Sequence, residues 1–465
     1  MYSLTGKRKE TTMFIHPLKR LVHRSYVASL LLLVFVAGCG SLPPAPMSAD
    51  AAQSGPAAVQ QQAALAQPTA AQIIGEDPAT MQPPGEDPAT MQPPGEDPTT
   101  MEPVNKLPAP LYMLSESGQI YRIEQDGVTR NQITFEVPAN PDVPPITEFA
   151  VSPADGTLAY VVRAGNQDSL VLSEPLGPPR SALNFAPYRV SDLVWSPDGR
   201  ALAVRLDSDT PNMMMPNGVY LVSPVYSEPG LFQADDPANP EQTNFSYAPV
   251  SWSPDGTQLL LKRFWKQISY CKLAVKSVEN GARDMTPTVL AAPRLQDRES
   301  WVCDSATWSA DSRAVYLSLE TFIPERLKAG LWRADAQTGQ VEPGIPMERD
   351  GILTLFAGSQ LARDGYIYSF VGQSRSAPGS LVPDATFAGY AMSRIALETG
   401  DVAPLMSGFL YPTRVLWAAD GSGAVVQQEG HTDAQDLVWL AAGSDGLLPL
   451  PGGDLQPTAL AWGML

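Results

Sequence analysis

Histidine and cysteine are scarce in this chain, which has three of each among its 465 residues. His16 and His23 fall in the basic N-terminal segment, so His431, in the polar stretch QQEGHTDAQD, is the single histidine of the rest. Zinc sites mostly use several histidine or cysteine ligands, and the sequence has neither a G-x-S-x-G elbow nor an Asp-x-Asp-x-Asp-Gly calcium loop. The sequence therefore predicts no catalytic residue, no metal site and no cofactor, with His431 in a solvated loop.

Positive charge is also scarce, with 31 Lys and Arg against 49 Asp and Glu and a net charge of −18. Residues 1–38 contribute +5 and residues 39–110 contribute −7, which leaves −16 on residues 111–465. A surface this acidic repels phosphate backbones, so nucleic acid is not an expected partner. No apolar run reaches the ~20 residues that a membrane-spanning helix needs.

The N-terminus has the plan of an export signal. Basic residues precede an apolar run from Val27 to Val36, which ends in VAGCG. About ten apolar residues suit a secretory signal and are too few to span a bilayer. The segment resembles a bacterial lipoprotein signal, which implies removal of residues 1–38 and a lipid on Cys39; an ordinary signal or a short anchor is the alternative. The expected location is extracytoplasmic and lipid-anchored, at the outer membrane if the cell has two, because Gly40 follows Cys39.

Residues 39–110 are expected to be a disordered linker. They are rich in Pro, Ala, Gln and Gly, and the decapeptide GEDPATMQPP starts at Gly75 and recurs, with small changes in the last copy, at Gly85 and Gly95. Such a segment cannot bury enough apolar area to offset the entropy of ordering it. We interpret it as a spacer, although the repeat could instead be a ligand for a partner.

A short turn phrase recurs through residues 111–465. WSPDG occurs at Trp195–Gly199 and at Trp252–Gly256. Pro, Asp and Gly are residues that close a tight turn, and apolar, β-rich residues flank each copy, so each copy predicts a strand–turn–strand unit. The turn aspartates are spaced by 43, 57, 56, 53 and 56 residues and are Asp155, Asp198, Asp255, Asp311, Asp364 and Asp420. We interpret them as hairpin residues rather than catalytic carboxylates.

Most of these units are followed by two further strand-like segments, and four strands in a period near fifty residues are typical of β-propeller blades. The chain ends in ALAWGML, whose Trp462 occupies the place of the tryptophan before a turn, while residues 111–134 read as the second, third and fourth strands of a blade. The last strand should therefore complete the first blade and close the ring. The sequence predicts an all-β chain with a single propeller over 111–465, of seven blades, or six if the irregular Asp364 unit is not a blade.

The turn phrase resembles that of the TolB-type propellers, whose WD-repeat-like units carry a Trp-Ser-Pro-Asp-Gly turn. The resemblance covers residues 111–465 and is specific at Trp195–Gly199 and Trp252–Gly256. It implies a scaffold that binds other proteins of the cell envelope. TolB has an additional N-terminal α/β domain where this chain has low-complexity linker, so TolB's own role in envelope constriction is not carried over.

Two features are candidate partner-binding surfaces. Three methionines lie between prolines in the loop TPNMMMPNG, and flexible Met side chains suit adaptable apolar contacts, although packing on the blade is the alternative. Segments 136–148, 237–250, 293–304 and 407–414 are expected to connect blades at one mouth of the ring. Aromatic and Arg side chains there are typical interface anchors. The candidate residues are Met213, Met214, Met215, Arg294, Arg298, Trp301, Phe409, Tyr411 and Arg414.

Two cysteines remain after Cys39. Cys271 and Cys303 both belong to the Asp255 unit, and an even number of cysteines in an exported protein suggests a disulfide, with two buried free thiols as the alternative. One blade also gathers basic residues, for which a solvated face is the simplest interpretation. They are Lys262, Arg263, Lys266, Lys272 and Lys276.

These observations predict a membrane-anchored, monomeric binding or scaffold propeller with envelope proteins or glycans as partners, and no enzymatic activity. The alternative is a propeller enzyme, of lactonase, lyase or hydrolase type, that acts on a small ligand in the central funnel. The enzyme hypothesis requires carboxylates that converge in the funnel with strongly shifted pKa values.

Overall fold

The computed structural model describes fifteen segments of residues 106–464. They are 106–165, 167–175, 179–211, 215–224, 228–236, 245–265, 268–279, 286–290, 300–301, 305–320, 328–346, 348–375, 387–428, 436–444 and 446–464. The chain divides into two compact units, Met1–Pro93 and Pro94–Leu465, and every described residue belongs to the second. Cys39 and nearly all of the linker lie outside the described residues, so the predicted signal and lipid site stay predictions.

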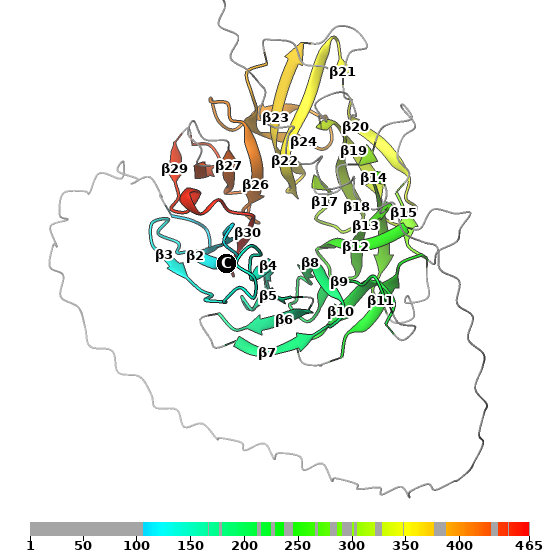
Figure 1. Ribbon diagram of the computed structural model, residues 1–465. Coiled ribbons are helices and arrows are strands. Elements are labelled where there is room, and N and C mark those ends of the chain that lie inside the picture. Colours follow the sequence, from blue (N-terminus) through cyan, green and yellow to red (C-terminus); the bar gives the residue numbers. More distant parts are fainter. Residues whose placement is uncertain are drawn as a thin grey trace, which may run out of the picture. The chain divides into compact units, whose positions relative to one another are not determined.

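The described strands form seven blades around a central axis (Figure 1). Blade 1 comprises β4 (Ile146–Val151), β5 (Leu158–Ala164), β6 (Gln167–Ser173) and β7 (Pro179–Asn184). Blade 2 comprises β8 (Arg189–Trp195), β9 (Leu202–Asp207), β10 (Gly218–Val222) and β11 (Gly230–Ala234). Blade 3 comprises β12 (Phe245–Trp252), β13 (Gln258–Trp265), β14 (Ile268–Ser277) and β15 (Thr288–Val289).

The second half of the ring repeats this plan with more irregularity. Blade 4 comprises β16 (Ser300–Trp301), β17 (Thr307–Trp308), β18 (Ala314–Glu320), β19 (Lys328–Asp335) and β20 (Val341–Ile345). Blade 5 comprises β21 (Glu348–Arg349), β22 (Ile352–Arg363), β23 (Tyr366–Arg375), β24 (Ala391–Ala396) and β25 (Val402–Pro404). Blade 6 comprises β26 (Pro412–Trp417), β27 (Gly423–Gln428), β28 (Asp436–Ala441) and β29 (Leu447–Pro449).

Blade 7 joins the two ends of the propeller and confirms the predicted closure. It comprises β30 (Ala459–Trp462), β1 (Leu111–Leu114), β2 (Ile120–Ile123) and β3 (Arg130–Gln132). β30 pairs antiparallel with β1, with Leu111 opposite Trp462 and Leu114 opposite Ala459. Seven blades, and not six, complete the ring, because the Asp364 unit is a full blade.

The irregularity of blade 5 has a structural cause. The start of β22 pairs with the start of β19 of blade 4, with Lys328 opposite Phe356 and Ala329 opposite Leu355. Blades 4 and 5 therefore form one ten-stranded sheet. β22 then breaks register between Ala357 and Leu361 before it continues as the first strand of blade 5.

The turn phrase forms the tight hairpin that its residues predict. In the first full copy, Ser196 Oγ donates to Asp198 Oδ1 at 2.7 Å, and the Arg200 N–H donates to the same oxygen at 3.1 Å. The Ser253–Asp255 and Ser309–Asp311 pairs repeat the first bond at 2.6 Å. These hydrogen bonds occupy the carboxylates, which supports their interpretation as hairpin residues.

Five first strands end in a tryptophan that joins its blade to the previous one. Trp417 Nε1 donates to the carbonyl of Ser359 in blade 5 at 2.9 Å, and Trp462 Nε1 donates to the carbonyl of Trp417 in blade 6 at 2.8 Å. Trp195, Trp252 and Trp308 make the same kind of bond at 3.4, 3.0 and 3.4 Å. The indole rings also fill the apolar layer between blades, so the repeat marks the contacts between blades.

The core consists of apolar layers between adjacent blades. The layer between blades 1 and 2, for example, buries Leu170 and Val161 against Trp195 and Leu202. The three consecutive leucines of β13, Leu259 to Leu261, are all fully buried, so both faces of this part of the second strand are covered. Among the described residues, none of the helical structure is long and apolar enough to cross a membrane.

Candidate functional site

The meander within each blade gives the ring two different faces. The Trp-Ser-Pro-Asp-Gly turns and the turns between third and fourth strands lie on one, which we call the turn face. The connections between blades and the loops between second and third strands lie on the other, which we call the connection face. The first strands, including β4, β8 and β30, surround the central channel between them (Figure 1).

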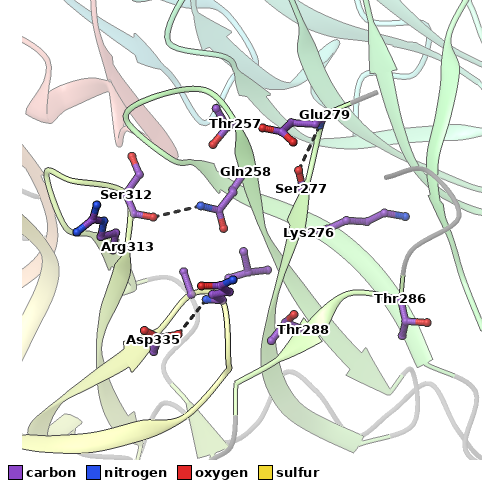
Figure 2. Close-up of a pocket in the computed structure, with 13 residues that line it drawn as sticks. Thr257, Gln258, Lys276, Ser277, Glu279, Thr286, Thr288, Ser312, Arg313 and Asp335 are labelled. Atoms are coloured by element: carbon purple, nitrogen blue, oxygen red, sulfur yellow. Dashed lines mark hydrogen bonds between the residues drawn. The ribbon is translucent and has the colours of Figure 1, made fainter. Parts of the chain in front are cut away.

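The turn face has a cleft of about 450 Å³ between blades 3 and 4, shown in Figure 2. Its polar groups bind one another: Gln258 Nε2 donates to the Ser312 carbonyl at 3.2 Å, and the Gln337 N–H donates to Asp335 Oδ1 at 3.1 Å. Lys276 donates to the Phe232 carbonyl at 2.8 Å. The cleft is therefore a polar seam between two blades, in which several of the lining groups are already hydrogen-bonded.

The central channel has a cavity of about 570 Å³. It is lined mainly by the first strands of blades 1, 2, 3 and 7, and blade 3 adds Lys262 from its second strand. Its polar lining residues are Thr147, Glu148, Asp192, Lys262 and Thr458. The cavity therefore brings together ionisable side chains from three blades.

β-Bulges place these side chains in the channel. The pairing of β4 with β5 shifts register at Thr147, and that of β8 with β9 shifts between Ser191 and Val194. A bulge bends a strand and redirects its side chains, and bulges are frequent beside functional sites. Asp192 has φ of 54°, in the left-handed region that few non-glycine residues adopt. The backbone therefore accepts strain at the point where it presents a carboxylate to the channel.

Glu148 and Asp192 form the centre of the site. The Asp192 backbone N–H donates to Glu148 Oε2 at 2.5 Å, and Ser191 Oγ donates to Asp192 Oδ2 at 2.8 Å. Lys262 Nζ lies 3.8 Å from Asp192 Oδ1. Thr147 Oγ1 is buried and makes no hydrogen bond to any described residue. One acid, one carboxylate, one ammonium and one unused hydroxyl thus share the cavity.

The environment raises the pKa of Glu148. Burial raises the pKa of Glu148 from 4.5 to about 7, and the negative charge of Asp192 adds to the rise. The N–H groups of Asp192 and Leu193 and the charge of Arg163 oppose it. A carboxyl with a pKa near 7 can both give and accept a proton at neutral pH, as general acid–base catalysis requires. Among the described residues, no group of three or more His, Cys, Asp or Glu is placed to hold a metal ion.

The aromatic candidates predicted in segment 407–414 lie on the connection face. Phe409 is 57% exposed and Tyr411 is 55% exposed, between blades 5 and 6. Arg414 is partly buried and lies on β26 rather than in the connection, because the first strand begins at Pro412, earlier than predicted.

The other candidates are only partly described. Met215 is partly buried and packs on the layer between blades 1 and 2, and its carbonyl accepts a hydrogen bond from Tyr188, which fits the packing alternative. Met213, Met214, Arg294 and Arg298 lie outside the described residues.

Two further predictions concern blades 3 and 4. Trp301 is in β16, opposite Leu319 of β18, so this position is strand and not connection. Cys271 lies on the third strand of blade 3, as predicted, opposite Phe264. Cys303 and the side chain of Cys271 lie outside the described part of the chain, so the disulfide stays a prediction.

Solved structures with similar folds include TolB from Acinetobacter baumannii, at 12% identity and a TM-score of 0.41, over 77% of this chain and 67% of that one. They also include prolyl oligopeptidase B from Galerina marginata bound to a 35mer hydrolysis and macrocyclization substrate, at 10% identity and a TM-score of 0.47. That match covers 73% of this chain and 50% of the oligopeptidase, about half its length. These likenesses concern the fold alone, and they include the TolB-type propeller that the turn phrase indicates. No protein-family model and no curated protein matches the chain.

Sequence reasoning missed Glu148 and Asp192 and assigned Lys262 to a solvated face. The acids are 44 residues apart, and neither belongs to the turn phrase. One signal was available. Each acid lies four to seven residues before its turn, on a first strand, and the first strands surround the channel. When the repeats are aligned, acidic residues at similar positions on the first strands of two adjacent blades are expected to lie close together in the channel.

Proposed function

We propose that the chain is a binding propeller, held outside the cytoplasm by a lipid on Cys39, whose connection face binds a protein partner. Residues 1–38 are its signal and residues 39–110 its tether. The tether would place the connection face at a distance from the membrane, where an envelope protein can reach it.

The observation that carries the proposal is the exposure of large apolar side chains on the connection face. Phe409 and Tyr411 are more than half exposed, and Phe135 and Val137, which precede blade 1 on the same face, are 74% and 85% exposed. Exposed aromatics gathered on one face of a soluble domain are typical of an interface, where they supply much of the binding energy. The acidic charge of the propeller favours a partner with a basic surface.

A crosslinking pull-down of the full-length protein from its own cell tests the proposal. The variant Phe409→Ala/Tyr411→Ala removes the aromatic pair. The matched control is Val128→Ala/Leu447→Ala, which truncates two exposed apolar residues on the turn face, 73% and 42% exposed. A Cys39→Ser variant tests the anchor, because it should move the protein from the membrane to the soluble fraction.

We expect one envelope protein to be captured by the wild type and by the control, and to be lost or reduced about tenfold or more with the aromatic variant, as truncation of central interface residues commonly costs over 1 kcal/mol each. Equal capture by the two variants would refute the assignment to the connection face. Absence of any protein partner would refute the scaffold function.

One observation favours the second candidate, an enzyme acting on a small ligand in the channel. Glu148, with its pKa raised to about 7 by burial and by Asp192, is suited to acid–base chemistry beside a cavity of about 570 Å³. Glu148→Gln separates the candidates, because it keeps the shape of the side chain and removes its proton transfer. A binding propeller should complement a deletion strain fully with Glu148→Gln, whereas an enzyme should not.

A further inference from the structure

Arg414 differs from other partly buried arginines of the propeller. Arg163, Arg205 and Arg263 each pair with an aspartate at 3.0 Å. Arg414 makes no ion pair with any described residue, and burial, unopposed by a neighbouring carboxylate, lowers its pKa. A desolvated cation without a counter-charge is costly, and it is unexpected in a domain that carries a net charge of −16.

Arg414 is nevertheless held firmly through one of its nitrogens. Nη1 donates to the Pro457 carbonyl at 2.9 Å and to Gln427 Oε1 at 3.2 Å. Gln427 Nε2 donates to the same Pro457 carbonyl at 3.1 Å, and the Gln427 side chain is buried. These three bonds form a closed network that fixes the plane of the guanidinium before any ligand arrives.

The network leaves one edge of the guanidinium unused. Nε and Nη2 make no hydrogen bond to any described residue. Arg414 lines a pocket of about 330 Å³ between blades 6 and 7 on the connection face, together with Thr413, Gln456 and Thr458. Nε and Nη2 form the parallel pair of donors that matches the two oxygens of a carboxylate.

We infer that this pocket binds a carboxylate on the free edge of Arg414. The Gln456 amide supplies a neutral donor beside it, whereas the Thr413 and Thr458 hydroxyls already donate to the carbonyls of Gln427 and Leu114. A monoanion fits better than a dianionic phosphate, because Arg414 is the one basic residue among the described residues that line the pocket and the acidic Glu116 lines it too. The site goes beyond the proposed function, since it follows from the contacts of Arg414 and requires no protein partner.

Saturation-transfer NMR on the full-length protein tests the site with small probes. Acetyl-alanyl-alanine offers a chain-terminal carboxylate, acetyl-aspartyl-amide offers a side-chain carboxylate, and acetyl-alanyl-alanine amide offers none. We expect signal from one or both acids, with dissociation constants of about 1 mM, and none from the amide. The stronger of the two acids identifies the source of the carboxylate.

Three variants assign the signal. Arg414→Gln should weaken binding about tenfold or more, whereas Arg200→Gln, which removes an exposed arginine from the turn face, should leave it unchanged. Glu116→Gln should strengthen binding severalfold, because it removes a like charge from the pocket and leaves Arg414 in place. This variant keeps the inference testable if Arg414→Gln fails to fold.

The inference is overturned if the wild type binds neither acid, if the amide binds as well as the acids, or if folded Arg414→Gln binds as the wild type does. Inorganic phosphate that displaces the probe more strongly than either acid would overturn the assignment to a carboxylate. The probes are small molecules, so a negative result here leaves partner capture by Phe409 and Tyr411 unaffected, and the reverse also holds.

Discussion

Replacement of Glu148 by Gln should make the propeller more stable at alkaline pH and leave it nearly unchanged in acid. Gln mimics the protonated carboxyl, and its carbonyl oxygen can still accept the hydrogen bond that the Asp192 N–H donates at 2.5 Å. The substitution therefore removes the cost of charging a buried group beside Asp192 without removing the contact.

The magnitude follows from the pKa of Glu148, which burial and Asp192 raise from 4.5 to about 7. A raised pKa means that the folded state holds the proton more tightly than the unfolded state, so wild-type stability falls as the pH rises between these values. At about 1.4 kcal/mol for each pH unit, the loss is about 3 kcal/mol above pH 8 and less than about 1 kcal/mol at pH 5.

Urea denaturation of the wild type and of Glu148→Gln at pH 5 and pH 8.5 measures this difference directly. Asp192→Asn is the matched control, because it removes the neighbouring charge and should lower the pKa of Glu148, so that the pH dependence becomes smaller. A free-energy difference between Glu148→Gln and the wild type that is the same at both pH values would refute the reasoning.

Three further predictions concern the ring. Trp417→Phe removes the Nε1–H donor to the Ser359 carbonyl and part of a buried ring, and should lower the free energy of unfolding by about 2–4 kcal/mol in urea titrations; a loss under about 1 kcal/mol would contradict the role of the tryptophan between blades. Deletion of residues 459–465 removes the strand that completes blade 7 and should abolish cooperative unfolding followed by circular dichroism, whereas a retained sharp transition would show that closure is dispensable. Ser196→Ala removes the hydroxyl that, with the Arg200 N–H, holds the pKa of Asp198 below its ordinary value, and should raise that pKa in a ¹³C NMR titration; an unchanged value would contradict the hairpin assignment.

The blades could be predicted because their signal is local. Turn residues such as Ser, Asp and Gly close the hairpins through bonds between residues at most five apart, as between Ser196 and Ala201, so similar residues recur at most of the turns. Closure by β30 could also be predicted, since one strand was missing at the front of the chain and one was left over at the end. The seven-blade ring therefore follows from the sequence with few assumptions.

The structure differs from the sequence-based predictions where the contacts join residues far apart in the chain. The pairing of Lys328 and Ala329 with Phe356 and Leu355 merges blades 4 and 5, and no turn phrase records it. The first strands begin earlier than the phrase indicates, which moved Arg414 from a connection into β26. These boundaries depend on pairing partners that only the folded ring supplies.

The channel site is the least predictable part for the same reason. Burial in the folded ring and the charge of Asp192, from the neighbouring blade, raise the pKa of Glu148. The bulges at Thr147 and Asp192 have no characteristic residue pattern that would mark them in the sequence. Lys262 reads as one member of a basic surface, yet it lies 3.8 Å from Asp192 in the channel. Charge counts along the chain do not distinguish a channel lysine from a solvated one.

A structural role and a functional role make different demands on Glu148. The bulge in β8 frees the Asp192 N–H from the strand ladder, and Glu148 supplies the acceptor that this buried donor needs. An acceptor for backbone N–H groups does not require a titratable group, because the Gln carbonyl oxygen would also accept and would avoid the cost of charge at neutral pH. Glu at this position therefore costs stability that a purely structural side chain would not, and such a cost is characteristic of groups retained for their chemistry. If Glu148→Gln is more stable and fully functional, that argument fails, and the carboxyl is only the acceptor for the bulge.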